Sequence, residues 1–198
     1  MTSPIAGSDG TSGSGGTSRP GGTSASGGTA KVGRAAAEAI LQRWASQAQI
    51  EAVPGSRPGE FVVELPGEAK LRTAVSLLIG DRALSASAFV MRRPDENHAA
   101  FYRWMLTRNS RLPGVAFALD KLGDVYLVGR VPLVGVTVDT LDELLGAILT
   151  ASDGSFNDLL ALGFLTSMRR EWAWRIDRGE STRNLDAFRH LLDDAPSP

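Results

Sequence analysis

The chain contains no cysteine, which excludes disulfide bonds and zinc sites built from thiolates and is consistent with a reducing compartment. No apolar run approaches the roughly 20 residues that a membrane-spanning helix needs. The N-terminus has neither the basic start nor the apolar centre of a secretion signal. We therefore expect a cytoplasmic protein with no membrane partner.

A strong charge of either sign is also absent, because the formal net charge is −1. The chain as a whole therefore has no excess of positive charge that would attract nucleic acid. The two histidines, His98 and His190, fall on different expected helices, and no Ser accompanies them in a nucleophile motif. Asp120 and Asp124 flank a turn, where carboxylates usually accept backbone N–H groups. We predict no catalytic residue, cofactor or metal ligand, and a protein that is not an enzyme.

Three regions differ in composition. Residues 1–33 repeat Gly, Thr and Ser about every six positions and have too little apolar surface to offset chain entropy, so we expect a disordered tail. Residues 34–180 have the composition of one folded domain. In residues 181–198 we expect a short helix, capped by Asn184 and carrying Leu185, Phe188 and Leu191, followed by a frayed end.

The strands are predicted from alternating apolar residues bounded by turn residues. Three consecutive strands form an antiparallel meander, and a hairpin follows later in the chain. The meander strands are 60–65, 71–79 and 84–91, and the hairpin strands are 115–119 and 125–131. In the hairpin, Val115, Phe117 and Leu119 are expected to face the core.

Apolar residues at three- and four-residue spacing predict the helices. We expect Ala36, Ile40, Trp44 and Ala48 to form the buried stripe of the first helix. A helix beginning at Asp139 or Thr140 should be interrupted at residues 152–155, where Ser-Asp-Gly-Ser breaks the pattern, and Gly179 should end the next one. The expected helices are 34–49, 95–108, 139–150 and 156–177.

The hairpin and the helix after it resemble the YbjN family of bacterial proteins. An Arg-Leu-Pro turn, a Gly-Asp turn and a strand that closes on Arg-Val-Pro-Leu carry this resemblance, in Arg111, Leu112, Pro113, Asp120, Gly123, Asp124 and residues 130–133. The order of the predicted helices and strands extends this resemblance to residues 34–178. The resemblance implies an α+β fold like that of type III secretion chaperones, with one antiparallel sheet and flanking helices. It also implies a role in sensory transduction, and it carries no catalytic residues.

Two groups of side chains are candidates for partner contacts. Trp172 and Trp174 are two residues apart on one helix, so they cannot share a face. If Trp172 lies in the buried stripe, Trp174 points elsewhere, either to an interface or beneath the last helix. The second group lies around the helix at 95–108 and combines arginines with aromatic residues: Arg92, Arg93, Arg103, Arg108, Arg111, Tyr102 and Trp104.

We predict a non-enzymatic protein-binding module with a chaperone-like or regulatory role. The resemblance implies a homodimer, and the identity of the protein partner is open. One alternative is the binding of an anionic ligand or nucleic acid by the arginines of residues 92–111. The other alternative is an enzyme whose site the sequence does not reveal.

Overall fold

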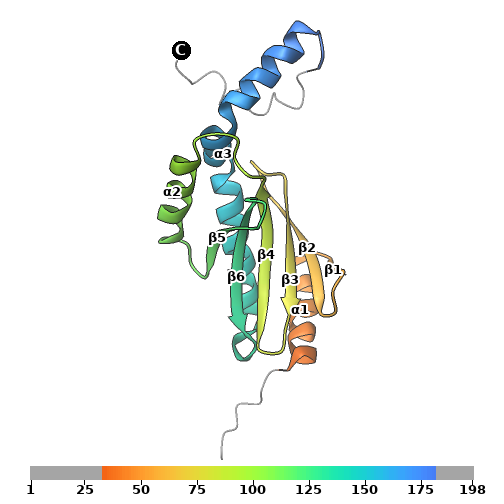
Figure 1. The fold of residues 1–198 in the computed structure, drawn as a ribbon. Helices are drawn as coiled ribbons and strands as arrows, with labels where there is room; N and C mark the ends of the chain where they lie inside the picture. The colour runs from red at the N-terminus through yellow and green to blue at the C-terminus, as the bar shows by residue number, and fades with distance from the viewer. Residues whose placement is uncertain (1–32, 182–198) are drawn as a thin grey trace, which may run out of the picture. The chain divides into compact units, whose positions relative to one another are not determined.

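The computed structural model describes residues 33–181, so the expected tail and the expected last helix lie outside the described residues. A six-stranded antiparallel sheet with the order β1-β2-β3-β4-β6-β5 forms the centre (Figure 1). Its strands are β1 (Ala52–Pro54), β2 (Glu60–Pro66), β3 (Arg72–Ile79), β4 (Ala83–Met91), β5 (Val115–Leu119) and β6 (Val125–Pro132). The predicted α+β class, the meander and the hairpin are confirmed. The sequence missed β1, because three residues before a Pro-Gly turn show no period.

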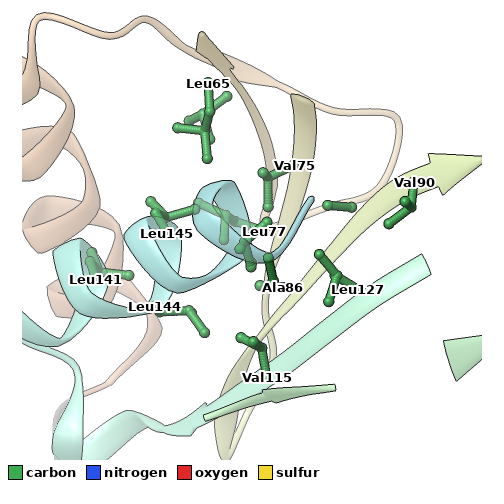
Figure 2. Close-up of a cluster of buried hydrophobic side chains, with 14 of the residues drawn as sticks. Leu65, Val75, Leu77, Ala86, Val90, Val115, Leu127, Leu141, Leu144 and Leu145 are labelled. Atoms are coloured by element: carbon green, nitrogen blue, oxygen red, sulfur yellow. The ribbon is translucent and has the colours of Figure 1, made fainter. Parts of the chain in front are cut away.

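Two helices cover one face of the sheet, and no helix among residues 33–181 lies over the other (Figure 1). These are α1 (Arg34–Ala48) and α3 (Val138–Asp177), while α2 (His98–Asn109) packs beside β5 and against α3. Figure 2 shows Leu144 and Leu145 of α3 pointing toward side chains of the strands. The core therefore lies between the sheet and the first half of α3.

The buried face of α1 differs from the predicted stripe. Ala37, Leu41, Trp44 and Ala45 are buried, and Ala36 and Ala48 at the two ends of the predicted stripe are exposed. A strict four-residue spacing drifts around a helix of 3.6 residues per turn, so it leaves the core after one or two turns. The indole of Trp44 donates a hydrogen bond to Asp142 Oδ1 of α3 at 3.1 Å, which links the two helices.

The predicted interruption of α3 at residues 152–155 is wrong, because the helix is continuous there. The polar residues that suggested a break make tertiary hydrogen bonds instead. Ser152 and Thr73 of β3 are both fully buried, and their hydroxyl oxygens lie 3.2 Å apart. Asp153 Oδ1 accepts the backbone N–H groups of Glu68 and Lys70 at 2.9 Å each. These residues attach α3 to the turn between β2 and β3.

The ends of α3 follow known capping chemistry. The helix begins at Val138 with Thr137 as its N-cap, not Asp139 or Thr140, and Thr137 and Thr140 form a reciprocal capping box. At the other end, Gly179 has a φ of +66°, and the N–H groups of Gly179 and Glu180 bond to the carbonyls of Ile176 and Arg175. This is a Schellman motif, so the predicted stop at Gly179 is confirmed.

The hairpin of β5 and β6 follows the predicted register for two of its three inward positions. Val115 and Phe117 are buried, but Leu119 at the strand end is 45% exposed. Asp120 accepts the N–H groups of Leu122 and Asp124, as expected for turn chemistry. On the outer edge of β5, the side-chain amide of Asn109 accepts the N–H of Phe117 and donates to its carbonyl, at 2.7 and 3.2 Å.

Candidate protein-binding groove

A short loop before α2 holds α3 near its middle. The N–H groups of Asp95 and Glu96 both donate to the carbonyl of Gly163, at 2.9 and 3.2 Å. Glu96 Oε1 accepts the N–H of Thr166 at 2.7 Å, and Asn97 Nδ2 donates to the carbonyl of Leu162 at 3.1 Å. Polar groups that contact helix backbone in this way are a recognised cause of helix bending. Figure 1 shows that α3 changes direction in this part of its course.

These contacts also explain why α2 begins at His98 and not at Asp95 as predicted. The backbone of Asp95 and Glu96 is used to bind α3, and Asn97 has a left-handed conformation with a φ of +51°. Gly163 permits the close approach, because a Cβ atom there would lie 2.8 Å from Pro94 and 2.9 Å from the ring of Phe101. A glycine inside a helix therefore has a packing reason at this position.

Beside this contact, α3 and the end of β4 enclose a groove of about 660 Å³. Its lining is mostly apolar, with charged groups at a few points. The residues are Lys70, Phe89, Val90, Met91, Arg92, Phe156, Leu160, Phe164, Ser167, Met168 and Glu171. We call this surface the α3 groove. Its size and its apolar lining with few polar groups are typical of binding sites.

The charged groups of the α3 groove are held in place by specific contacts. The Arg92 guanidinium stacks over the ring of Phe164 at 4.6 Å and forms an ion pair with Asp95 at 2.5 Å. The hydrogen bond from Arg92, with a second from Ser167, lowers the pKa of Asp95 to about 2. Lys70 donates to the carbonyl of Phe89, and burial lowers its pKa. The groove thus offers charged groups of both signs, held in place by these contacts, beside apolar surface.

Trp174 lies on the same face of α3 as the α3 groove. It follows Phe156 by 18 residues, which is five helical turns. A second hollow of about 310 Å³ is lined by Ser167, Arg170, Glu171 and Trp174, and it shares two residues with the groove. The Trp174 side chain is 43% exposed, with Arg178 stacked on its ring. The groove surface therefore continues along the helix to this tryptophan.

The structure separates the other predicted contact residues. Arg103, Trp104, Arg108 and Arg111 line a different hollow of about 400 Å³ together with Asp158. Trp104 is half-buried against Phe117, at 6.1 Å between ring centroids. Arg92 belongs to the α3 groove, so the predicted arginine cluster is divided between two surfaces.

Two more predicted contact residues lie outside both hollows. Arg93 lies at the hairpin turn, where its N–H donates to Asp124 and its side chain packs near Gly123. Trp172 is half-buried, on a different side of α3 from Trp174.

Sequence reasoning did not identify Phe89 or Lys70 as site residues. A signal for Phe89 exists in the alternation of β4, because Leu84, Ala86 and Ala88 face the core and place Phe89 on the opposite side. Phe89 is exposed there and packs edge-on against Tyr126 of β6, at 5.5 Å between centroids. For Lys70, which precedes β3, no comparable periodic signal exists.

The uncovered sheet face is a second exposed surface, with a row of uncharged side chains between charged ones such as Glu64 and Arg130. It presents aliphatic and aromatic residues between small side chains, and the exposed fractions of Val53 and Val128 are 48% and 37%. Neighbouring strands align these residues in one row: Val53, Val62, Ser76, Ser87, Val128 and Ala116. No charged side chain interrupts this row.

Two other kinds of site are absent from the described range. None of the helices in residues 33–181 combines the length and the apolarity needed to cross a bilayer. Within the same range, no three His, Asp or Glu side chains gather closely enough to hold a metal ion.

Comparison with known proteins gives a family and distant structural likenesses. The family model described as "YbjN: Putative bacterial sensory transduction regulator" matches residues 38–161. An uncharacterised protein of Mycobacterium leprae is 53% identical over 134 residues, which are 68% of this chain and 73% of that protein.

Two solved structures are similar at lower identity. The type III secretion chaperone SycH of Yersinia pestis is 19% identical with a TM-score of 0.45, over 59% of this chain and 96% of that chain. YbjN of E. coli is 14% identical with a TM-score of 0.41, over 60% and 90%.

Proposed function

Because the chain belongs to the YbjN family, we propose that it is a regulatory or chaperone-like module that acts by binding another protein and catalyses no reaction. The observation that carries this proposal is the α3 groove, an apolar surface next to fixed charge. Protein interfaces commonly combine an apolar centre with a polar rim and use Trp, Met and Arg as anchors. Met168, Arg92 and Trp174 supply those three residue types on one side of α3.

The shape and chemistry of the groove suit an amphipathic segment of the partner. Apolar side chains of such a segment would pack on Leu160 and Met168, in the manner of a helix bound in a groove. An acidic residue of the partner would be attracted by Lys70, which has no carboxylate partner among the described residues. The proposed partner is therefore an apolar segment with at least one acidic residue.

Affinity capture from the native cytoplasm tests this proposal. The full chain, Met168→Glu and Trp174→Ala are immobilised, and retained proteins are quantified by mass spectrometry. Leu106→Glu is the matched control, because it places the same charge at a side chain of α2 that is 70% exposed and outside the groove. We expect one set of proteins to be retained by the wild type and the control and lost from both groove variants. Equal retention by all four would contradict the proposal.

We further propose a homodimer, as the family resemblance implies, with the uncovered sheet face between the two copies. The row of uncharged side chains supports this choice, since a second copy would remove Val53 and Val128 from water. Sedimentation equilibrium at micromolar concentration measures the state directly. Val128→Glu should dissociate the dimer, and Leu106→Glu should not. A wild-type monomer would rule out this part of the proposal.

A second candidate function rests on the hollow beside α2. Arg103, Arg108 and Arg111 line it together with Trp104, and the guanidinium of Arg108 lies 5.9 Å from that ring. Arginines beside an aromatic ring can bind an anionic ligand or a base. Salt-sensitive retention on heparin, lost in Arg103→Ala, would favour this function. Asp158 in the same hollow opposes it.

We propose residues 34–180 as the folded domain. The buried side chains of the described range run from Ala37 to Phe164, which supports a boundary near Arg34. A chain that lacks residues 1–33 should melt within a few degrees of the full chain. A much larger decrease in the melting temperature would move the boundary toward the N-terminus.

A further inference from the structure

A separate hollow lies between the first half of α3, the end of β6 and the loop that joins α2 to β5. Its volume is about 510 Å³, which is in the range typical of small-molecule sites. Small residues of α3, namely Gly146, Ala147 and Ala151, leave this space open. Leu112 of the loop and Val131 of β6 add apolar side chains to its lining. We call this space the β6–α3 hollow.

Arg108 brings a buried donor without an acceptor to the β6–α3 hollow. It lies in the last turn of α2 and lines both this hollow and the one beside α2. Its Nε atom is buried and has no hydrogen-bond partner among residues 33–181. The guanidinium forms no ion pair in that range, and it lies 5.9 Å from the ring of Trp104. A buried N–H of a charged group is costly to leave unpaired, so we expect an acceptor in the hollow.

The other charged residues of the hollow do not supply this acceptor. Glu143 lines the hollow, but it is exposed and forms no ion pair with Arg108. Arg130 alternates along β6 with Gly129, which faces α3, so the Arg130 side chain points to the uncovered sheet face. There its Nε donates to Ser85 Oγ at 3.3 Å. Arg108 is therefore the guanidinium that remains available to a ligand in the hollow.

We propose that the β6–α3 hollow binds a small amphiphilic carboxylate. Its carboxyl group accepts the Nε–H of Arg108, and its apolar chain packs on Leu112, Val131 and Ala147. A guanidinium and a carboxylate form short, charge-assisted hydrogen bonds. A ligand with a single negative charge suits one available guanidinium, because Glu143 would repel a second charge. The hollow shares no lining residue with the α3 groove, so this site does not depend on the proposed function of that groove.

Titration of the full chain with octanoate tests the proposal, by calorimetry and by nitrogen–proton NMR. Two further ligands are matched controls, since octanol has the same chain without the charge and acetate has the charge without the chain. We expect saturable binding of octanoate, with shift changes centred on the Nε–H of Arg108 and on Ala147. Octanol and acetate should each bind at least about tenfold more weakly.

Four variants of the full chain form two matched pairs. Arg108→Met removes the charge and keeps the length of the side chain, and Arg82→Met does the same at an exposed arginine outside the hollow. Gly146→Leu fills the hollow, and Gly154→Leu is its control on the same helix, with equally free space at the Cβ position. Arg108→Met and Gly146→Leu should weaken octanoate binding by about tenfold or more, and the controls by less than about twofold. Glu143→Gln should strengthen it, because a like charge is removed.

Several results would overturn this assignment. They are the absence of saturable octanoate binding, equal affinities for octanoate and octanol, and equal losses in Gly146→Leu and Gly154→Leu. Shift changes centred on Phe164 would place the ligand in the α3 groove, and changes centred on Arg103 would place it in the hollow beside α2; either result would reject the site. Circular dichroism verifies that each variant is folded. If Arg108→Met unfolds, the comparison of octanoate with octanol on the wild type still decides whether the charge is recognised.

Discussion

The two halves of α3 differ in what surrounds them. From Leu141 to Ala151 the helix buries an apolar stripe against the sheet and α1, and from residue 165 to residue 177 none of its residues is buried. Both halves have apolar residues at helical spacing. The first half stabilises the domain by removing apolar area from water. The second half leaves comparable side chains accessible, including Met168 and Trp174, and is therefore suited to recognition.

A short loop contacts α3 at the point where its two halves meet. The loop at residues 95–97 binds backbone groups of Leu162, Gly163 and Thr166, at the point where the sheet contacts end. Polar groups of this loop thus support the helix where apolar packing stops. The second half is held as an ordered extension, and an ordered surface loses less conformational entropy when it binds.

The largest effect on stability is expected in the first half of α3. Leu145→Ala removes a side chain that is 1% exposed and should lower the free energy of unfolding by about 2–5 kcal/mol. Ile176→Ala in the second half, where the side chain is 61% exposed, should change it by less than about 0.5 kcal/mol. Urea unfolding measures both values. Similar losses would mean that the second half is also part of the core.

An intermediate effect is expected at the junction with the β2–β3 turn. Asp153→Ala removes the acceptor of two backbone N–H groups and should cost about 2 kcal/mol. Asp158→Ala, an exposed carboxylate one turn later, is the control and should cost little. If the two variants unfold at the same urea concentration, Asp153 does not attach α3 to the turn.

A smaller effect that depends on pH is expected from Asp95, beside the bend. Its pKa is about 2 in the folded protein and 3.8 ordinarily, so it is lowered by folding. A lowered carboxyl pKa stabilises the protein above the ordinary value, and this stabilisation is lost as the pH falls toward 2. The melting temperature of Asp95→Asn should therefore be below that of the wild type by a constant amount from pH 7 to pH 5.

That difference in melting temperature should shrink between pH 4 and pH 2. Asp81→Asn is the control, because the Asp81 side chain is 90% exposed and its contact with Arg34 is 3.7 Å. Calorimetry over the pH range provides the measurement. A difference that persists unchanged at pH 2 would show that the carboxylate of Asp95 does not stabilise the fold.

Only a small effect on stability is expected from Trp174→Ala, in the exposed half. Its side chain is 43% exposed, so the free energy of unfolding should change by less than about 1 kcal/mol while the capture of partners weakens. Urea unfolding measures the first quantity and affinity capture the second, and circular dichroism verifies that the variant is folded. A variant that unfolds would make Trp174 a structural residue.

Local patterns in the sequence predicted the sheet better than the helix boundaries or the site. Thr73, Val75, Leu77 and Ile79 alternate in the sequence and are all buried, because one sheet face alone is covered. Ser152 and Asp153 suggested a break because they are polar residues that favour turns. The prediction failed because their hydrogen-bond partners lie about 80 positions earlier, where no local pattern reveals them. Tertiary contacts overrode the local preference for a turn.

For the α3 groove, too, local sequence patterns do not reveal which elements come together. Leu160, Phe164 and Met168 recur every four residues, and that spacing is the same for a stripe beneath a sheet and for a stripe that lines a groove. The position of β4 relative to α3 decides between the two cases, and sequence periodicity contains no information about it. Trp174 was accessible to sequence reasoning only because Trp172 lies two positions away.

Each outer edge of the sheet has one position at which a further strand cannot form its usual hydrogen bonds. At β5, the amide of Asn109 occupies the N–H and the carbonyl of Phe117, the groups with which a further strand would pair. At β1, Pro54 has no N–H to offer. Unpaired edges are the usual starting points of strand exchange and fibril growth. Asn109 therefore occupies, at this one position, the hydrogen-bonding groups that a seventh strand would use, and it hinders the addition of a strand to this edge.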